Sequence, residues 1–282
     1  MVSVSVIIPT FNRADKIMRA VESALAQTHQ VYEIIVVDDG STDSTSKVFN
    51  YISDSRVKYV SMAHSGLPAV VRNTAMKLAK GDFVAFLDSD DIWLPKKLEI
   101  QLSQVKKYPE IGLFCSNAYI DDELNHPMQT FHESNLSQSI WTYENLLEKN
   151  IVITSSVLAK KSLLEASGNF PEESLFRAIE DYALWLKVAY SSPIFYSHNP
   201  LTIYSDLGNS LRFDVKLEDY WLGMLKLVDY SLSSQNSVRI INPKIIRKVR
   251  SRFLKELAIV YYRDKKNINS AVCILKAIMN RF

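Results

Sequence analysis

The chain has 282 residues, of which 47% are hydrophobic and 23% charged, which is ordinary for a globular protein and excludes a largely disordered one. Its two cysteines exclude a disulfide framework or a Cys-rich zinc site. No run of about 18 apolar residues predicts a membrane span, and the first residues do not resemble a signal peptide. The formal net charge is +2, but residues 243–282 carry +9, so the remainder carries −7. Such a basic tail favours contact with an anionic surface, and lipid headgroups are the first candidate for that surface.

The first hundred residues alternate between predicted strands and helices. Apolar, β-branched runs predict strands at residues 2–8, 32–37, 57–62 and 83–87, and apolar residues at helical spacing predict helices at 15–27, 46–52 and 69–79. A strand, a helix and a second strand within about forty residues indicate a parallel α/β sheet. We therefore expect an α/β fold with a mostly parallel central sheet flanked by helices.

Acidic residues follow two of these predicted strands. Asp38 and Asp39 follow the strand at 32–37, and Asp88, Asp90 and Asp91 follow the strand at 83–87. Ligands of parallel α/β sheets bind beyond the carboxyl ends of the strands. Three carboxylates this close repel one another unless a cation lies among them, and hard oxygen ligands suit Mg²⁺ or Mn²⁺. The alternative is a polar loop whose side chains cap the next helix.

Phosphate-binding glycine motifs are absent from the sequence. No Gly-x-Gly-x-x-Gly follows the first strand, and no Gly-x-x-x-x-Gly-Lys-Ser/Thr occurs, so a dinucleotide Rossmann fold and a P-loop are poorly supported. Arg72 and Asn73 fall in the first turns of the helix at 69–79, where they suit an anion, although an exposed Arg is commonly only solvated. The sequence therefore predicts that metal and side chains hold any phosphate.

The second part of the chain mixes short strands and helices before a helical end. Strands are predicted at residues 111–120, 154–159, 194–197 and 201–204, helices at 96–107, 143–149, 162–167 and 178–189, and helical structure from 213 onward. Glu180 and Asp181 begin the helix at 178–189, where a helix dipole alone accounts for acids. A catalytic role for Asp181 is the other interpretation.

Four blocks in this order resemble glycosyltransferase family 2. They are residues 3–13 (Ser-Val-Ser-Val-Ile-Ile-Pro-Thr-Phe-Asn-Arg), 33–43 (Glu-Ile-Ile-Val-Val-Asp-Asp-Gly-Ser-Thr-Asp), 88–91 (Asp-Ser-Asp-Asp) and 180–181 (Glu-Asp). The resemblance covers residues 1–212 and implies a GT-A fold, with a nucleotide-sugar-binding half at 1–100 and an acceptor-binding half at 101–212. Residues 213–282 lie beyond this catalytic domain as a basic, helical extension.

The resemblance also implies roles for individual residues. Pro9, Thr10 and Arg13 would border the nucleotide, and Asp39 would accept the uracil N–H. Arg72 would approach the nucleotide. The family's Asp-x-Asp corresponds to Asp88, Ser89 and Asp90, with Asp88 and Ser89 near the ribose, and Asp90 together with Asp88 on the Mn²⁺ or Mg²⁺ that bridges the diphosphate. Asp181 would be the general base.

One block of the family is missing. Many relatives follow the last sheet strand with Tyr-Arg-x-His, where Arg meets phosphate and His binds metal, but this chain has Tyr204-Ser205-Asp206-Leu207. Fewer protein ligands to the metal are therefore expected, with water or Asp206 as replacements. This departure keeps a non-catalytic nucleotide-sugar-binding scaffold open as an alternative. A sugar nucleotidyltransferase is a second alternative, although residues 9–13 lack the Gly-rich loop that it would need.

The function expected from this resemblance is inverting transfer of a sugar, most often from a UDP-sugar, to a hydroxyl of a glycan or lipid-linked saccharide in bacterial surface polysaccharide synthesis. Nucleic acid is not an expected partner. The chain is expected in the cytoplasm, at the inner face of the membrane. An apolar stripe in residues 243–282 lies beside basic residues, so this region either contacts an anionic membrane or packs as a helix pair on the catalytic domain.

Overall fold

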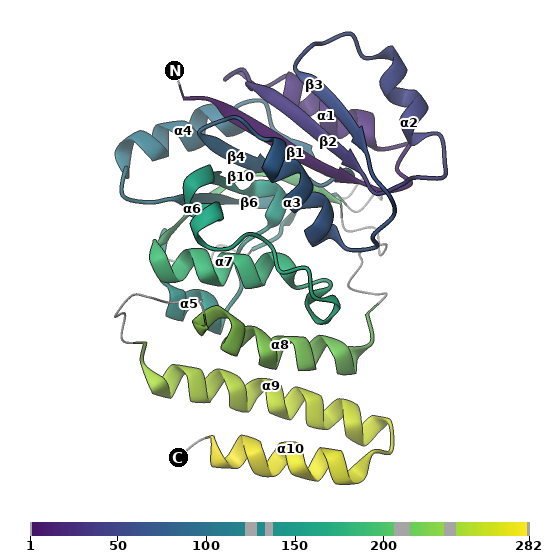
Figure 1. Ribbon diagram of the computed structural model, residues 1–282. Coiled ribbons are helices and arrows are strands. Elements are labelled where there is room, and N and C mark those ends of the chain that lie inside the picture. Colours follow the sequence, from purple (N-terminus) through teal and green to yellow (C-terminus); the bar gives the residue numbers. More distant parts are fainter. Residues whose placement is uncertain (1, 122–128, 133–137, 206–214, 234–240, 281–282) are drawn as a thin grey trace.

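The structure is a computed structural model that describes residues 2–121, 129–132, 138–205, 215–233 and 241–280 (Figure 1). Its centre is a mixed sheet with the strand order β3-β2-β1-β4-β9-β6-β10-β5, with β7 on β6 and β8 on β10. The strands are β1 (Val4–Thr10), β2 (Glu33–Asp38), β3 (Val57–Ser61), β4 (Phe83–Phe86), β5 (Ile92–Trp93), β6 (Leu113–Asp121), β7 (Gln129–Thr130), β8 (Ile140–Trp141), β9 (Leu158–Lys160) and β10 (Ile194–Ser205). The helices are α1 (Ile17–Leu25), α2 (Thr45–Val48), α3 (Pro68–Leu78), α4 (Lys97–Lys107), α5 (Tyr143–Glu148), α6 (Lys161–Ala166), α7 (Glu180–Ser191), α8 (Leu217–Leu232), α9 (Pro243–Arg263) and α10 (Asn267–Met279).

The parallel part of the sheet comes from the first hundred residues, as predicted. Strand β1 pairs in parallel with both β2 and β4, and β2 pairs in parallel with β3. Strand β9 lies between β4 and β6 and is antiparallel to both, whereas β6 and β10 are parallel. The α/β class is thus confirmed, and the second half of the chain makes the sheet mixed. The carboxyl ends of β1, β2 and β4 meet at one edge.

Both faces of the sheet are covered, which explains why its strands are continuous apolar runs. Val4, Val6 and Ile8 of β1 pack in one cluster with α1 and α4. Ile7 and Phe86 point to the other face, where α3 and α7 cover them (Figure 1). This two-sided packing holds rigid the strand ends that carry the acidic residues.

Three segments of the second half differ from the sequence-based prediction. Thr154–Ser156 of the predicted strand at 154–159 form a 3-10 turn, and only β9 is extended. The two short strands predicted at 194–197 and 201–204 are one strand, β10, with a bulge after Ser197. Helix α7 begins two residues later than predicted because Ala178 has a left-handed φ of 69°, which ends helical geometry there.

The C-terminal helices stack away from the sheet in the order α8, α9, α10 (Figure 1). Helix α8 packs on α7, α9 packs on α8 and α5, and α10 packs on α9. Basic residues of α9 and the turn that follows pair with acids of the preceding chain: Lys248 with Glu148, Arg250 with Asp229, and Lys266 with Glu218. The opposite net charges of residues 243–282 and residues 1–242 therefore support a helix pair, α9 and α10, that packs on the rest of the chain. The division of the chain into two domains at residue 212 stays a prediction.

A membrane span is not found in the part of the chain that the structure describes. None of its helices combines the length and the apolarity that crossing a bilayer requires.

Candidate functional site

A cavity of about 1120 Å³ opens at the carboxyl ends of β1, β2 and β4 and extends to α7, α8 and α9. All the sequence-predicted site residues line it: Pro9, Thr10, Arg13, Asp39, Arg72, Asp88, Ser89, Asp90 and Asp181. Parallel pairing brings the residues that follow β1, β2 and β4 to one edge, α3 adds Arg72, and α7 adds Asp181. Residues up to 172 positions apart in sequence thus share one cavity.

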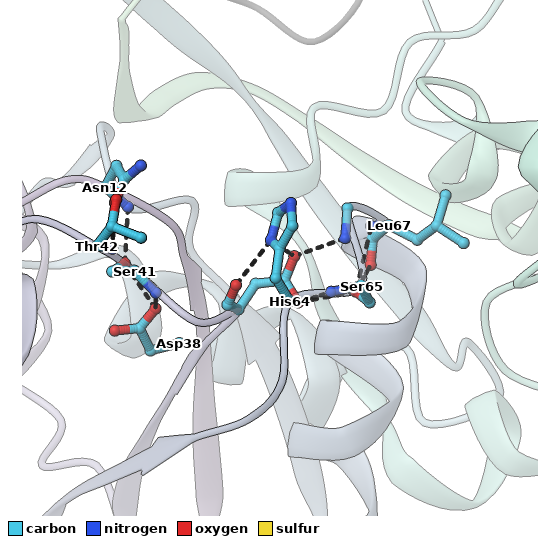
Figure 2. Close-up of polar contacts among 9 residues, drawn as sticks. Asn12, Asp38, Ser41, Thr42, His64, Ser65 and Leu67 are labelled. Atoms are coloured by element: carbon cyan, nitrogen blue, oxygen red, sulfur yellow. Dashed lines mark hydrogen bonds and ion pairs between the residues drawn. The ribbon is translucent and has the colours of Figure 1, made fainter.

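Asp39 ties the end of β2 to the segment that leads into α3. Its Oδ1 accepts hydrogen bonds from Ser65 N (2.7 Å) and Ser65 Oγ (2.8 Å), and its Oδ2 accepts one from Gly66 N (2.9 Å). His64 Nδ1 lies 3.0 Å from the same Oδ2. Figure 2 shows His64 and Ser65 side by side in this network. A carboxylate has about four acceptor positions, so any ligand N–H that Asp39 accepts must share an oxygen with these donors.

The loop after β1 is fixed by Asn12, whose left-handed φ of 51° suits an Asn. Asn12 Oδ1 accepts hydrogen bonds from Thr42 N (2.8 Å) and Asp43 N (3.3 Å), and Asn12 N donates to Ser41 Oγ at 2.7 Å (Figure 2). Phe11 next to it stacks on His64 with ring centroids 4.3 Å apart. Phe11 and His64 line the cavity beside Asp39 and were missed by sequence reasoning, since a single Phe in a loop carries no pattern.

The acidic loop after β4 is held by Ser155, which sequence reasoning also missed. Asp88 N donates to Ser155 Oγ at 2.9 Å, and that hydroxyl donates to Asp91 Oδ2. Ser205 N donates to Asp91 Oδ1 at 2.9 Å. Burial, followed by the charges of Asp88 and Asp90, raises the pKa of Asp91 well above its ordinary value. Asp91 thus supports the loop. The run of three hydroxyl side chains at residues 154–156 could have indicated such a role, but the sequence predicted a strand there.

Asp88 and Asp90 remain as the oxygen ligands for a cation. Burial and the neighbouring Asp88 raise the pKa of Asp90, against a lowering by Arg13, whose Nη2 lies 3.6 Å from Asp90 Oδ2. Mutual repulsion of two carboxylates is what a divalent cation relieves, and Mg²⁺ commonly takes one or two carboxylates plus substrate phosphates. Among the described residues no group of three or more His, Cys, Asp or Glu is placed to hold a metal, so this donor set fits a metal completed by phosphate and water. Asp206 and Leu207 lie outside the described residues.

Arg72 lies in the cavity wall, but its guanidinium is engaged with two carboxylates. Nη2 donates to Asp88 Oδ1 at 2.8 Å and Nη1 donates to Glu180 Oε1 at 2.7 Å. Burial lowers the pKa of Arg72, but Asp88, Glu180 and Asp181 outweigh it and raise that pKa above its ordinary value. Arg72 therefore fixes Asp88 and α7 relative to each other, a role that spacing alone did not indicate.

The adjacent acids Glu180 and Asp181 have different environments. Glu180 is buried against Arg72, and burial raises its pKa to about 7 although Arg72 lowers it. Asp181 faces the cavity, with Oδ2 accepting from Thr154 Oγ1 at 2.7 Å and Oδ1 accepting from Tyr182 N at 2.6 Å. A carboxylate that is oriented by donors and open to the cavity is suited to accept a proton. Of these two cavity-lining acids, Glu180 is engaged with Arg72, and Asp181 is the one that has only neutral donors.

Curated bacterial glycosyltransferases are similar to this chain. It is 36% identical over 185 residues to the UDP-Glc:alpha-D-GlcNAc-diphosphoundecaprenol beta-1,3-glucosyltransferase WfgD of Escherichia coli, covering 66% of this chain and 69% of that protein. It is 33% identical over 187 residues to the putative teichuronic acid biosynthesis glycosyltransferase TuaG of Bacillus subtilis, covering 66% and 71%. It is also 31% identical over 231 residues to an uncharacterized glycosyltransferase of Rickettsia felis, covering 82% of this chain but only 37% of that longer protein.

Solved structures share the fold. Staphylococcus aureus TarS 1-349 in complex with UDP superposes with a TM-score of 0.70 at 20% identity, covering 99% of this chain and 89% of that one. The mannosyltransferase PcManGT from Pyrobaculum calidifontis, in complex with GDP-Man and Mn²⁺, gives a TM-score of 0.59 at 15% identity, covering 99% and 87%. These likenesses confirm the predicted GT-A fold. The sequence model of glycosyl transferase family 2 matches residues 5–166, more than half of the chain, and the chain therefore belongs to that family.

Proposed function

We propose that the chain transfers a sugar from a nucleotide sugar, with UDP as the nucleotide, to a hydroxyl of a glycan or lipid-linked saccharide, with inversion at the anomeric carbon. The observation that carries this proposal is that one cavity is lined by Asp39 after β2, by Asp88 and Asp90 after β4, and by Asp181 of α7. A flat base, a diphosphate and a sugar with its acceptor need these three environments in this order.

The base end of the cavity supports a nucleoside. The Phe11 and His64 rings, stacked at 4.3 Å, offer an aromatic surface, and base stacking on such a surface is worth about 1–3 kcal/mol. Asp39 beside them accepts the N–H of uracil, sharing Oδ2 with His64. Pro9 and Thr10 border the nucleotide, and the buried Thr10 Oγ1, which has no partner among the described residues, is free to contact it.

The diphosphate end combines a cation site with fixed positive charge. Asp90 and Asp88 would hold Mn²⁺ or Mg²⁺, with Ser89 between them near the ribose. A divalent cation there neutralises charge on the diphosphate leaving group. Arg13, 3.6 Å from Asp90, adds a cation from this chain at the same end. Arg72 contributes by fixing Asp88, through its 2.8 Å hydrogen bond.

The acceptor end explains the expected stereochemistry. Asp181 removes the proton of the attacking hydroxyl while Thr154 Oγ1 and Tyr182 N hold its carboxylate in place. A single base on the face opposite the leaving group gives one displacement, and one displacement inverts the anomeric centre. The neighbouring carboxylate of Glu180 is engaged with Arg72 and is therefore not proposed as a nucleophile.

The names of two relatives support the proposed acceptor class. WfgD acts, by its name, on a sugar diphosphoundecaprenol, and TuaG is named for teichuronic acid biosynthesis. A role in bacterial surface polysaccharide synthesis at the inner membrane face agrees with both.

The outer face of α10 fits a lipid surface, with Ile268 81%, Leu275 61% and Met279 75% exposed. Cosedimentation with anionic vesicles should fall for Leu275→Glu and not for Tyr51→Glu, which alters an exposed aromatic of the catalytic domain.

The test of the function is release of UDP from a panel of UDP-sugars, with and without Mn²⁺ and with saccharide acceptors. Metal-dependent release that rises with an acceptor supports the transferase. UDP-sugar binding with no release under any condition would instead identify a binding scaffold, and formation of a nucleotide sugar from UTP and a sugar phosphate would identify a nucleotidyltransferase. Chromatography of the product against α- and β-linked standards decides whether the linkage is inverted.

A further inference from the structure

The cavity extends well past the donor end. Beyond Asp181 its wall is built by Arg177 and Ala178, which precede α7, by Tyr220 and Met224 of α8, and by Arg252 of α9. Helix α8 lies directly against the segment before α7, since a Cβ on Gly223 would come within 2.5 Å of Leu175 O. The helical extension therefore closes the acceptor end of the cavity, which the catalytic sheet alone would leave open.

Positive charge in the cavity wall is divided between the two ends. Arg13 and Arg72 pair with Asp90 and Asp88 at the donor end, and Lys16 lowers the pKa of Asp90 from nearby, against larger raising effects of burial and Asp88. Arg177 and Arg252 lie at the other end. Neither forms an ion pair with any acid of the described chain, so their charge is left for something else.

Three acids at this end of the chain's cavity already pair with other cations, and Asp181 is held by Thr154 Oγ1 and Tyr182 N. Glu148 pairs with Lys248 at 2.7 Å, Glu173 pairs with Lys226, and Glu180 pairs with Arg72. Among the described residues, the Arg252 guanidinium donates one hydrogen bond, from Nη1 to the backbone oxygen of Glu148 at 2.8 Å, and lies 5.0 Å from the centre of the Phe253 ring. Arg177 Nε is buried without a hydrogen-bond partner among the described residues. A buried donor without a partner carries a desolvation cost that a bound anion would remove.

Both arginines line the same cavity as Asp181. Arg177 is in the segment that leads into the α7 turn with Asp181, and both line the cavity. Burial raises the pKa of Tyr182, and the charge of Arg252 opposes that rise, so Arg252 is within electrostatic reach of the residue after Asp181. A group bound by both arginines would belong to the sugar whose hydroxyl faces Asp181, or to the atom that carries that sugar.

We propose that Arg177 and Arg252 bind a phosphate group of the acceptor, attached to the sugar that receives the transferred residue. This inference rests on the proposed glycosyl transfer. Guanidinium groups hold phosphate through paired, charge-assisted hydrogen bonds, whereas a neutral glycan is held by amides, carboxylates and aromatic faces. The acceptor is therefore a sugar linked through a phosphate ester or diphosphate, and the extension of α8 and α9 supplies half of its anion site.

The experiment compares two acceptor probes on protein saturated with UDP and Mg²⁺: GlcNAc α-linked to a decyl diphosphate, and the neutral decyl GlcNAc glycoside. Arg177→Gln and Arg252→Gln should each weaken binding of the diphosphate probe about tenfold, and the double variant more, since charge-assisted hydrogen bonds of this kind are the strong ones. Binding of the neutral glycoside should not change. Lys255→Gln is the matched control, because it removes one exposed charge from the same helix outside the cavity.

UDP affinity and the melting temperature of each variant keep the result interpretable. Unchanged affinity for the diphosphate probe in the double variant, or equal weakening of both probes, would overturn the proposal. Weaker binding of UDP in Arg177→Gln or Arg252→Gln would overturn it too, because the arginine would then serve the donor. A failure of the proposed transferase itself has a different signature: UDP-sugars that are neither bound nor turned over by the unaltered chain.

Discussion

Arg72 Nη1 donates a 2.7 Å hydrogen bond to Glu180 Oε1, which joins α3 to the first turn of α7 across 108 positions of sequence. The same guanidinium binds Asp88 at the end of β4 through Nη2. One buried cation thus sets the distance between the acidic loop of the donor end and the helix that carries Asp181. The position of the proposed base depends on a residue that need not touch the substrate.

Replacing Arg72 should therefore destabilise the whole domain. At a pH above about 7, where Glu180 is ionised, Arg72→Met leaves Asp88 and the buried Glu180 without their cation. Breaking a buried ion pair from one side typically costs about 3–5 kcal/mol. Urea unfolding monitored by circular dichroism measures this free energy. Lys77→Met, an exposed change on the same helix, is the control and should alter stability by less than about 0.5 kcal/mol. A loss for Arg72→Met as small as that of the control would refute the structural role.

Glu180 predicts a pH dependence of stability. Its pKa of about 7 in the fold is above the ordinary value of 4.5, so the native state holds a proton that the unfolded chain has lost. Between about pH 4.5 and 7 the unfolded state binds fewer protons, and stability contributed by this group therefore falls as pH rises. The unfolding free energy of the unaltered chain should drop more over that window than that of Glu180→Gln. Parallel profiles for the two proteins would contradict the raised pKa.

The sequence predicted the catalytic fold because its signals were local. Apolar runs at β2 and β4 end in acids, and parallel pairing of both strands with β1 brings those ends to one edge of the sheet. Strand pairing thus indicated a shared edge for these acids, and the resemblance to the family assigned roles to Asp39, Asp88 and Asp90. The strand at 194–205 was broken in two because the bulge after Ser197 interrupts the alternation that reveals a strand.

The contacts that organise the site could not be predicted, since they join distant segments. Ser155 binds both Asp88 N and Asp91, and nothing in a Thr-Ser-Ser run distinguishes a loop anchor from a strand residue. The role of Arg72 depends on Glu180, and the unpaired state of Arg177 depends on which acids the rest of the fold engages. Pairing of charges is a property of tertiary packing, so composition indicated only that the tail was basic.

Asp90 and Asp91 are adjacent acids that should respond differently to substitution. Asp90→Ala should weaken metal-dependent binding of UDP by tenfold or more with little effect on folding, because Asp90 is the proposed, part-exposed oxygen ligand. Asp91→Asn should mainly lower the unfolding free energy, by about 1–3 kcal/mol. It replaces one of the two carboxylate oxygens that accept hydrogen bonds from Ser155 Oγ and Ser205 N. Isothermal titration with and without Mn²⁺, beside urea unfolding, separates the two effects. Unchanged metal dependence in Asp90→Ala would assign the metal to other ligands.

Asp181→Asn tests the proposed base. The amide keeps the size and one acceptor oxygen of the carboxylate but cannot take a proton, so transfer should fall about 10²–10⁴-fold. UDP binding should stay within a factor of about two of the original, since Asp181 is not among the residues proposed to hold the nucleotide or the metal. Thr154→Val is the matched comparison. It removes the 2.7 Å hydrogen bond that orients Asp181 but leaves the carboxylate, so its loss should be smaller and confined to kcat. Transfer assays with a saturating UDP-sugar measure both variants. Near-normal turnover of Asp181→Asn would remove Asp181 from this role and direct attention to Glu180, whose pKa of about 7 would then be the one that governs the pH profile.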